Sequence, residues 1–286
     1  MRFLKLSAII CIYFFFSGSI EPHKKISCQE LVTHMLDSLK NIKTQRYDLK
    51  ATERVNGHYL FAESHVKINS QPRKIYFKSI LKGNEVLWVQ GTNKGNAVVY
   101  SLSFPLINLN LDPYGSLMRK DQHYTIFDLG LQHIGILIAN TIIKAPKDFD
   151  KHFAYAGTHT FNHIECHQLL ISFPEYKYVE YSVEKGETVT DIAKKMGTSD
   201  FKIRYKNGLS GYYSELKEGK KLLIPTPYAN KVILYIDKKN YIPLSVKVYD
   251  EEGLFEAYDF YNITLNKTFT MDEFALNYKE YNFRKM

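Results

Sequence analysis

The chain has 286 residues, enough for one large domain or for a medium domain and a small one. It is 45% hydrophobic and 24% charged and has only 9 Pro and 15 Gly, a composition that excludes long disordered arms. The formal net charge of +8 is not gathered into any run of five basic residues, so we predict no nucleic-acid partner.

The first residues have the pattern of an export signal. Arg2 and Lys5 precede an apolar run over residues 6–16, and small residues follow it. The run is short for a bilayer span. We predict a cleaved signal peptide over residues 1–19, with a retained N-terminal anchor as the alternative. In both cases the protein is exported, to the periplasm or the cell envelope.

Two helices are predicted from apolar spacing. The first starts after Ser27, a residue type that caps helix N-termini, and its apolar residues recur at helical spacing up to Ile42. The second spans residues 128–144, where the apolar residues again follow a helical period and Pro146 ends the pattern.

The remaining segments predict antiparallel strands. Asn56-Gly57 is a two-residue turn of the kind that joins two strands into a hairpin. Other turn residues separate the later segments, so each strand leads directly to the next. The predicted strands span residues 47–55, 58–69, 73–80, 85–90, 97–104, 161–173, 231–237, 244–249 and 255–265. These elements predict the α+β class, with a run of antiparallel strands packed on helices.

The segment from His159 to His167 is the densest candidate for chemistry. On one continuous strand His163, Glu165 and His167 would share a face, with His159 in the same row. Two histidines and a carboxylate suit zinc or iron, but alternate residues of a strand lie about 7 Å apart. A polar strand facing solvent explains the pattern without a metal. We therefore predict no metal and no cofactor.

Two cysteines follow the export signal, Cys28 and Cys166. In an oxidising compartment a disulfide between them would tie the first helix to a distant strand, whereas two free buried thiols fit the sequence equally well. Cys166 would face away from His163 and His167, which is a poor arrangement for a Cys–His nucleophile. No serine-hydrolase, zinc-protease or phosphate-loop motif occurs, so we predict a non-enzyme and keep glycan hydrolysis as a third hypothesis.

Residues 178–225 have the pattern strand, helix, helix, strand. Thr188 can open the first helix, Ser199 can cap the second, and Pro225 closes the last strand. The order of these residues resembles the LysM domain; departures are Val189, Met196, Lys220 and a long loop over 210–215. The matching residues are Tyr181, Val183, Gly186, Glu187, Thr188, Ile192, Ala193, Ser199, Ile203, Asn207, Leu209, Leu216, Gly219 and 222–225.

The LysM resemblance implies binding of a glycan that contains N-acetylglucosamine, such as peptidoglycan or a chitin-like polymer. In that family the glycan lies in a shallow groove between two loops, and a tyrosine ring can stack on a sugar face. The alternative is that the module braces its host and the loop tyrosines pack inward. The candidate glycan-binding residues are Gly186, Glu187, Thr188, Asn207, Gly208, Leu209, Tyr212 and Tyr213.

The flanking segments, residues 23–177 and 226–286, resemble carriers of the outer-membrane lipoprotein-sorting type. They are also similar to an exported bacterial family of unknown function that has the same fold and a LysM insert. The likeness to the carriers rests on Asp237, Pro243, Asp250, Gly253, Phe260, Asn262 and Phe274. The likeness to the exported family rests on residues 111–113, 122–123 and 253–256. The resemblance implies a curved antiparallel β half-barrel packed on helices, with the LysM domain inserted as a βααβ module.

A half-barrel of this kind implies an apolar hollow that receives acyl chains of lipids or lipoproteins, although a filled core gives the same sequence pattern. The first hypothesis is therefore an exported, non-enzymatic envelope protein that binds peptidoglycan or a related glycan through its LysM module. The alternative is a periplasmic carrier of lipid, lipoprotein or other apolar cargo, with the module as a scaffold.

Overall fold

The computed structural model describes residues 26–102, 106–144 and 146–283. The predicted signal peptide over residues 1–19 lies outside these ranges. Within them, the helices are too short or too polar for any one to cross a bilayer.

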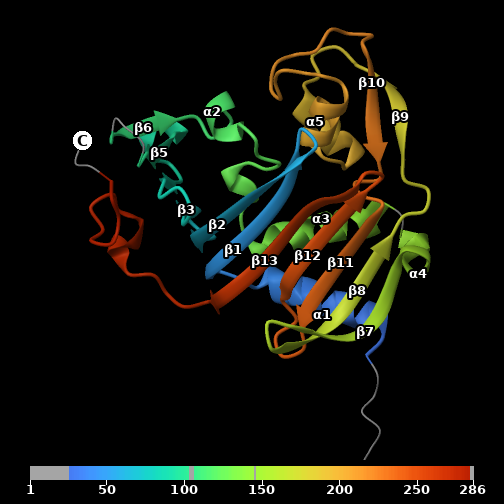
Figure 1. Cartoon of the computed structure of the whole chain (residues 1–286), viewed down its shortest axis with the longest axis horizontal. Helices are drawn as coiled ribbons and strands as arrows, with labels where there is room; N and C mark the ends of the chain where they lie inside the picture. Colours follow the sequence, from blue (N-terminus) through green and yellow to red (C-terminus); the bar gives the residue numbers. More distant parts are fainter. Residues whose placement is uncertain (1–25, 103–105, 145, 284–286) are drawn as a thin grey trace, which may run out of the picture.

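The scaffold is a single antiparallel sheet of 11 strands (Figure 1). The strands are β1 (Thr44–Val55), β2 (His58–Asn69), β3 (Lys74–Ser79), β4 (Glu85–Val89), β5 (Ala97–Tyr100), β6 (Asn108–Leu111), β7 (Phe153–Phe161), β8 (Ile164–Ser172), β11 (Lys231–Asp237), β12 (Pro243–Asp250) and β13 (Gly253–Leu265). Their order is β6-β5-β4-β3-β2-β1-β13-β12-β11-β8-β7. The two strands furthest apart in the chain, β1 and β13, therefore pair at the centre of the sheet.

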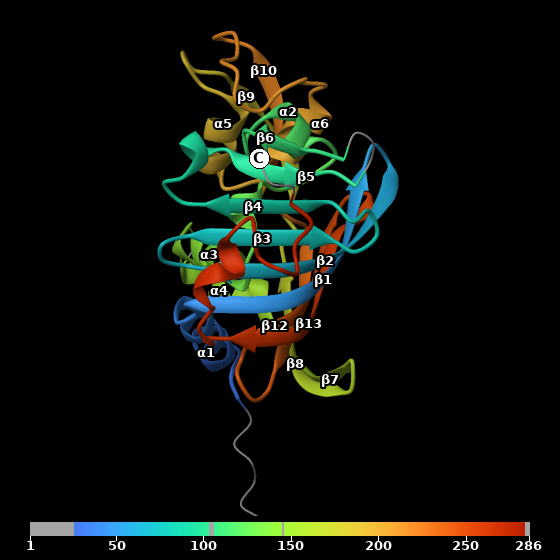
Figure 2. The ribbon, with the colours of Figure 1, turned by 90° about the vertical axis from the view of Figure 1, so that its left-hand side faces the viewer.

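Two long helices, α1 (Cys28–Lys40) and α3 (Leu131–Lys144), cover the inner side of the bent sheet (Figures 1 and 2). Ser27 caps α1 as predicted, through a capping box with Glu30. A Cβ atom at Gly135 would lie 3.1 Å from Leu39, so the glycine allows α3 to approach α1 closely. Shorter helices are α2 (Ser116–Arg119), α4 (Phe149–His152) and the 3₁₀ turns η1 (Asn93–Gly95), η2 (Ile126–Asp128), η3 (Pro146–Asp148) and η4 (Met271–Phe274). The α+β class is confirmed.

The continuous strand predicted over residues 161–173 is wrong at its start. Asn162 and His163 both have positive φ, 46° and 63°, and form a tight turn between β7 and β8. As a result His159 lies opposite Cys166 across a hairpin, and not in one row with His163. Asparagine tolerates the left-handed conformation, which allows a turn here without glycine.

The insert folds as β9 (Lys177–Ser182), α5 (Val189–Met196), α6 (Asp200–Lys206) and β10 (Lys221–Thr226), with β9 and β10 paired in their own sheet. It has a separate apolar core that includes Val189, Ile192 and Ile203. The strands before and after the insert, β8 and β11, are neighbours in the large sheet. The insert thus takes the place of a hairpin loop, and the Phe173 amide still donates a hydrogen bond to the Asn230 carbonyl oxygen at 2.7 Å.

The C-terminal segment packs on the outer side of the sheet. Phe274 and Phe283 form an apolar cluster with Tyr76 of β3 and Leu87 of β4. Figure 2 shows this segment crossing the strands on the side away from α3. The inner side of the sheet is therefore free of the C-terminal segment and faces the two long helices.

Candidate functional site

A cavity of about 1980 Å³ lies between the inner face of the sheet, α3 and the inserted module. Pockets for drug-sized ligands usually measure about 300–1,000 Å³, so this one has room for a larger molecule. The sheet contributes apolar residues such as Leu49, Ala51 and Val246, α3 contributes Ile134 and Leu137, and α5 of the insert closes another side.

Several large apolar side chains that line the cavity are exposed. Phe61 is 69% exposed, Leu117 69% and Leu81 63%. Single exposed apolar residues are common on protein surfaces. Three of them on the wall of one cavity give it an apolar opening, which is typical of a site for an apolar partner.

The insert is held on its host by a buried lysine and a buried phenylalanine of α6. Lys202 is 3% exposed, its Nζ lies 3.2 Å from the Asp250 carboxylate and 4.1 Å from the centre of the Phe255 ring. Phe201 is 1% exposed, and its ring centre is 4.2 Å from that of His123. Both residues would lie on the surface of an isolated module, so the contact with the host is what buries them.

A buried arginine of the host makes the second contact. Arg119 donates a hydrogen bond to Asp200 at 3.0 Å and another to the Tyr213 hydroxyl at 2.8 Å. Its guanidinium carbon lies 3.9 Å from the centre of the Tyr212 ring. Buried ion pairs contribute little net stability but fix relative positions, because a displaced partner leaves an unpaired charge. These contacts therefore fix the insert against the cavity.

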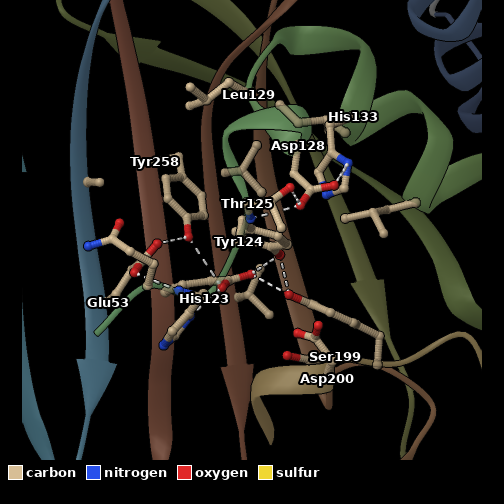
Figure 3. Close-up of a pocket in the computed structure, with 18 of the residues that line it drawn as sticks. Glu53, His123, Tyr124, Thr125, Asp128, Leu129, His133, Ser199, Asp200 and Tyr258 are labelled. Carbon is tan, nitrogen blue, oxygen red and sulfur yellow. Dashed lines mark hydrogen bonds and ion pairs between the residues drawn. The ribbon is translucent and has the colours of Figure 1, made fainter. Parts of the chain in front are cut away.

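A network of polar side chains forms one wall of the cavity (Figure 3). Glu256 is 1% exposed and accepts hydrogen bonds from Tyr124 at 2.8 Å, Tyr228 at 2.6 Å and His123 Nδ1 at 2.7 Å. His123 Nε2 lies 3.1 Å from the Arg54 carbonyl oxygen. Because both ring nitrogens face acceptors, both carry a proton, and His123 is an imidazolium cation.

The charges assigned to His123 and Glu256 agree with the directions of their pKa shifts. Burial alone would lower the pKa of His123, but the hydrogen bond to Glu256 and the charges of Glu53 and Glu256 raise it. Burial alone would raise the pKa of Glu256, but the hydrogen bond and charge of His123 lower it. In Figure 3, Glu53, His123 and Tyr258 point toward one another, and Tyr258 donates to Glu53 at 2.5 Å. The network satisfies its own members and offers no free base.

Four buried polar atoms of residues that line the cavity have no hydrogen-bond partner among the described residues. They are the Tyr47 hydroxyl, Arg119 Nε, His133 Nε2 and Thr198 Oγ1. Burial lowers the pKa of His133, although Asp128 lies 3.7 Å from its Nδ1. The ring is therefore neutral near pH 7. An unpaired buried polar atom costs about 1–3 kcal/mol.

The predicted glycan-binding residues of the first loop serve mainly to build the turn. Gly186 has φ +82°, and the Glu187 carboxylate accepts a hydrogen bond from the Tyr181 hydroxyl at 2.7 Å. Thr188 caps α5, and its hydroxyl donates to Asp191 at 2.6 Å. Of these residues, Thr188 also lines the cavity.

In the second loop Asn207 is engaged with the backbone. Its amide nitrogen donates to the Leu223 carbonyl oxygen at 2.9 Å, and its amide oxygen accepts from the Leu223 amide at 2.8 Å. Gly208 and Leu209 follow α6, and the Leu209 amide donates a hydrogen bond to the Arg204 carbonyl oxygen at 2.9 Å. This loop is therefore held by hydrogen bonds within the insert.

The two loop tyrosines pack on the host. Tyr212 is 7% exposed beneath Arg119, and the Tyr213 ring lies 5.2 Å from that of Tyr114. Tyr213 lines the cavity, as Thr188 does. Each of the two loops predicted to form a sugar groove therefore contributes one side chain to the cavity wall.

The remaining candidates do not form a site. Cys28 and Cys166 are free thiols, so the structure has no bridge between them. Cys166 is fully buried, and its Sγ donates to the Ile164 carbonyl oxygen at 3.5 Å. His159 stacks on Tyr235 with ring centres 4.3 Å apart. In the described ranges, no three His, Cys, Asp or Glu side chains are grouped so as to hold a metal ion.

Two family models match the chain. One, described as a protein of unknown function (DUF1571), matches residues 42–200, and the LysM domain model matches residues 181–225. Among curated proteins, none matches the sequence.

Solved structures similar to this chain are distant from it. They include a DUF1329 family protein from Desulfovibrio piger (9% identity, 88% of this chain and 99% of that chain, TM-score 0.33). Lipoprotein LppX from Mycobacterium tuberculosis shares 11% identity over 86% of this chain and 98% of that chain, with a TM-score of 0.42. A LolA superfamily protein from Nitrosomonas europaea shares 8% identity over 85% of this chain and 96% of that chain, with a TM-score of 0.29.

Proposed function

The chain belongs to the DUF1571 family of proteins of unknown function and carries a LysM domain, and we propose that it holds an apolar ligand with a long hydrocarbon chain. The observation that carries the proposal is the cavity of about 1980 Å³, whose walls are mostly apolar and whose opening exposes large apolar side chains. The protein acts after export, in the periplasm or cell envelope, as a non-enzymatic carrier or binder.

The energetics of such binding are favourable. Each buried methylene group contributes roughly 0.8 kcal/mol, so a dodecyl chain would supply about 10 kcal/mol before the entropic cost of association. The cavity wall is preformed, because the strands are fixed by the sheet and the insert is fixed by the contacts of Lys202 and Arg119. A preformed apolar cavity keeps most of that contribution.

A substitution that fills the cavity tests the proposal. Ala51 lines the cavity from β1. Ala257 does not line it and lies between the lining residues Glu256 and Tyr258, so its side chain faces the other side of the sheet. We expect Ala51→Trp to weaken binding of a fluorescent undecanoic acid probe by about tenfold or more. Ala257→Trp, the matched control, should bind the probe like the wild type.

Either of two results would refute the proposal. If wild type and both variants bind the probe equally weakly, or if the two tryptophan variants bind it equally well, the cavity is not the binding site. Circular dichroism and the unfolding midpoint of each variant separate a loss of binding from a loss of folding.

The LysM match favours a second candidate function, the binding of a glycan that contains N-acetylglucosamine, such as peptidoglycan. We propose residues 178–225 as this module, with its glycan contacts in the two loops over residues 186–188 and 207–213. Retention on purified peptidoglycan tests it, with Thr188→Asn as the variant, because asparagine keeps the helix cap while changing the side chain. Retention of the wild type no greater than that of an unrelated exported protein would exclude it.

A further inference from the structure

We infer that one edge of the large sheet is a membrane-docking surface, from which apolar side chains enter a lipid bilayer beside the cavity. The docking goes beyond the proposed function, and only its purpose, the passage of a hydrocarbon chain between bilayer and cavity, rests on that function. This docking edge consists of the first residues of β2, the β3–β4 turn and the described residues of the β5–β6 connection. The side chains that it presents are Leu60, Phe61, Ile80, Leu81, Leu102 and Ile107.

The topology of the sheet brings these three segments together. Strands β1 to β6 pair in chain order, and in such a meander every second connection lies at the same edge. The Ile80 amide donates a hydrogen bond to the Glu63 carbonyl oxygen at 2.7 Å, and the Leu102 amide donates to Asn84 Oδ1 at 3.2 Å. Figure 2 shows the tip of the β1–β2 hairpin projecting at the right-hand end of these strands. Residues distant in the chain therefore share one edge.

The apolar side chains of the docking edge extend into solvent. Phe61 is 69% exposed, Leu81 63% and Leu102 53%, and the other three are 43–44% exposed. A single exposed apolar residue is ordinary on a protein surface. Several of them gathered on one side of a molecule mark a surface that is covered by a partner or a membrane.

The charge of the docking edge fits a bilayer that contains anionic lipids. Residues 56–62 and 80–84 contain no acid, and their one permanently charged side chain, Lys82, is exposed. Glu63, the acid that follows in β2, is paired with Lys50 at 3.3 Å. Because a lysine near a membrane surface is attracted to anionic head groups, Lys82 would add to the attraction of the apolar side chains.

The docking edge is continuous with the cavity. Leu60, Phe61, Leu81 and Lys82 belong to the edge and also line the cavity. A hydrocarbon chain that leaves a bilayer here would reach the cavity along apolar side chains, without exposure to water. A protein bound at the same place would instead cover the opening of the cavity. Position and charge together therefore favour a lipid surface over a protein partner.

Sedimentation with lipid vesicles tests the inference on the full chain purified after export. One set of vesicles is an equal mixture of phosphatidylethanolamine and phosphatidylglycerol, and the other is phosphatidylcholine. We expect the wild type to bind both, and to bind the anionic vesicles more tightly. Lys82→Gln should weaken binding to the anionic vesicles by about fivefold and leave binding to phosphatidylcholine unchanged.

A double variant, Phe61→Ser with Leu81→Ser, removes the two most exposed apolar side chains of the edge. We expect it to bind both kinds of vesicle about tenfold more weakly than the wild type, because less apolar surface enters the bilayer. Ile143→Ser is the matched control: Ile143 is 73% exposed on α3 and does not line the cavity. It should bind vesicles like the wild type. Circular dichroism checks that each variant is folded.

Three results would overturn the inference: equal binding by the wild type and the double variant, an equal loss in Ile143→Ser, or a wild type that binds neither vesicle. In the last case, a dimer that dissociates in the double variant would assign the edge to a second copy of the chain.

The docking and the apolar-ligand function fail separately. Ala51→Trp, which fills the cavity, should lose the fluorescent undecanoic acid probe and still bind vesicles like the wild type. A wild type that binds the probe and no vesicle would refute the docking edge alone. A wild type that binds vesicles and not the probe would refute the apolar-ligand function and leave the docking edge standing.

Discussion

His123 is one of the residues at which the host and the insert meet. Its ring centre lies 4.2 Å from that of Phe201 in α6 and 4.2 Å from that of Phe255 in β13. Its charge is neutralised by Glu256 at 2.7 Å. A buried cation between two aromatic rings links the charge of the cavity wall to the position of the insert, so the protonation of His123 bears on the stability of the whole contact.

We expect this link to appear as a pH dependence. The pKa of His123 is raised above its ordinary 6.5, so the contribution of the protonated ring is complete below about pH 6.5 and is lost as the pH rises through the raised pKa. NMR titration of the His123 ring should give a midpoint above 6.5, and the free energy of unfolding should fall above it. A midpoint at or below 6.5 would contradict the imidazolium assignment.

Asn207 gives a second prediction. Its side chain joins α6 to β10 through two hydrogen bonds with Leu223. We expect Asn207→Ala to lower the free energy of unfolding by about 1–3 kcal/mol, because it leaves two backbone groups without their partner. The exposed Lys220→Ala in the same module should change it by no more than about 0.5 kcal/mol. Equal stability of the two variants in denaturant titrations would refute the structural role of Asn207.

Individual residues differ in how far the sequence could predict them. The caps at Ser27, Thr188 and Ser199 were predictable, because a cap acts on amides a few residues away. The partners of Arg119 and Lys202 were not. Their acids, Asp200 and Asp250, lie 81 and 48 residues away in the chain, and charged residues on short helices usually face water.

Among the helices and strands, features set by neighbouring residues were predictable, whereas pairings between distant parts of the chain were not. The β1–β2 hairpin was predictable from Asn56-Gly57, whereas the β7–β8 turn at Asn162-His163 contains no glycine and was missed. The pairing of β1 with β13 joins residues about two hundred positions apart, and no pattern in the sequence predicted it. The insertion point could be placed because the two strands of a LysM fold are neighbours.

At the scale of an element, helix α6 has two faces with different roles. Phe201 is 1% exposed against the host, whereas Tyr205 on the same helix is 44% exposed. We expect Phe201→Ala to lower the free energy of unfolding by about 3–5 kcal/mol, as for other buried phenylalanines. Tyr205→Ala is the matched control, with an expected loss of less than about 1 kcal/mol. Similar losses in urea titrations of the two variants would mean that α6 does not dock the insert.

For the whole molecule, the fold class could be predicted and the hollow could not. Alternating apolar residues describe a filled core and a cavity wall equally well, so the sequence left that choice open. The structure leaves a cavity of about 1980 Å³ beneath the insert. The insert itself has the predicted βααβ order, but its loop tyrosines Tyr212 and Tyr213 dock on the host. The cavity beneath the insert is the feature that supports the proposed function.

The most direct test of that function is native mass spectrometry of the full chain after expression with export and purification without detergent. We expect the wild-type protein and the Ala257→Trp variant to carry an additional mass that denaturation releases as an amphiphile with a hydrocarbon chain. Ala51→Trp should carry little or none of it. If the mass spectrum of the wild-type protein shows no bound molecule, and the protein also takes up no dodecyl probe when one is supplied, the cavity does not hold an apolar ligand.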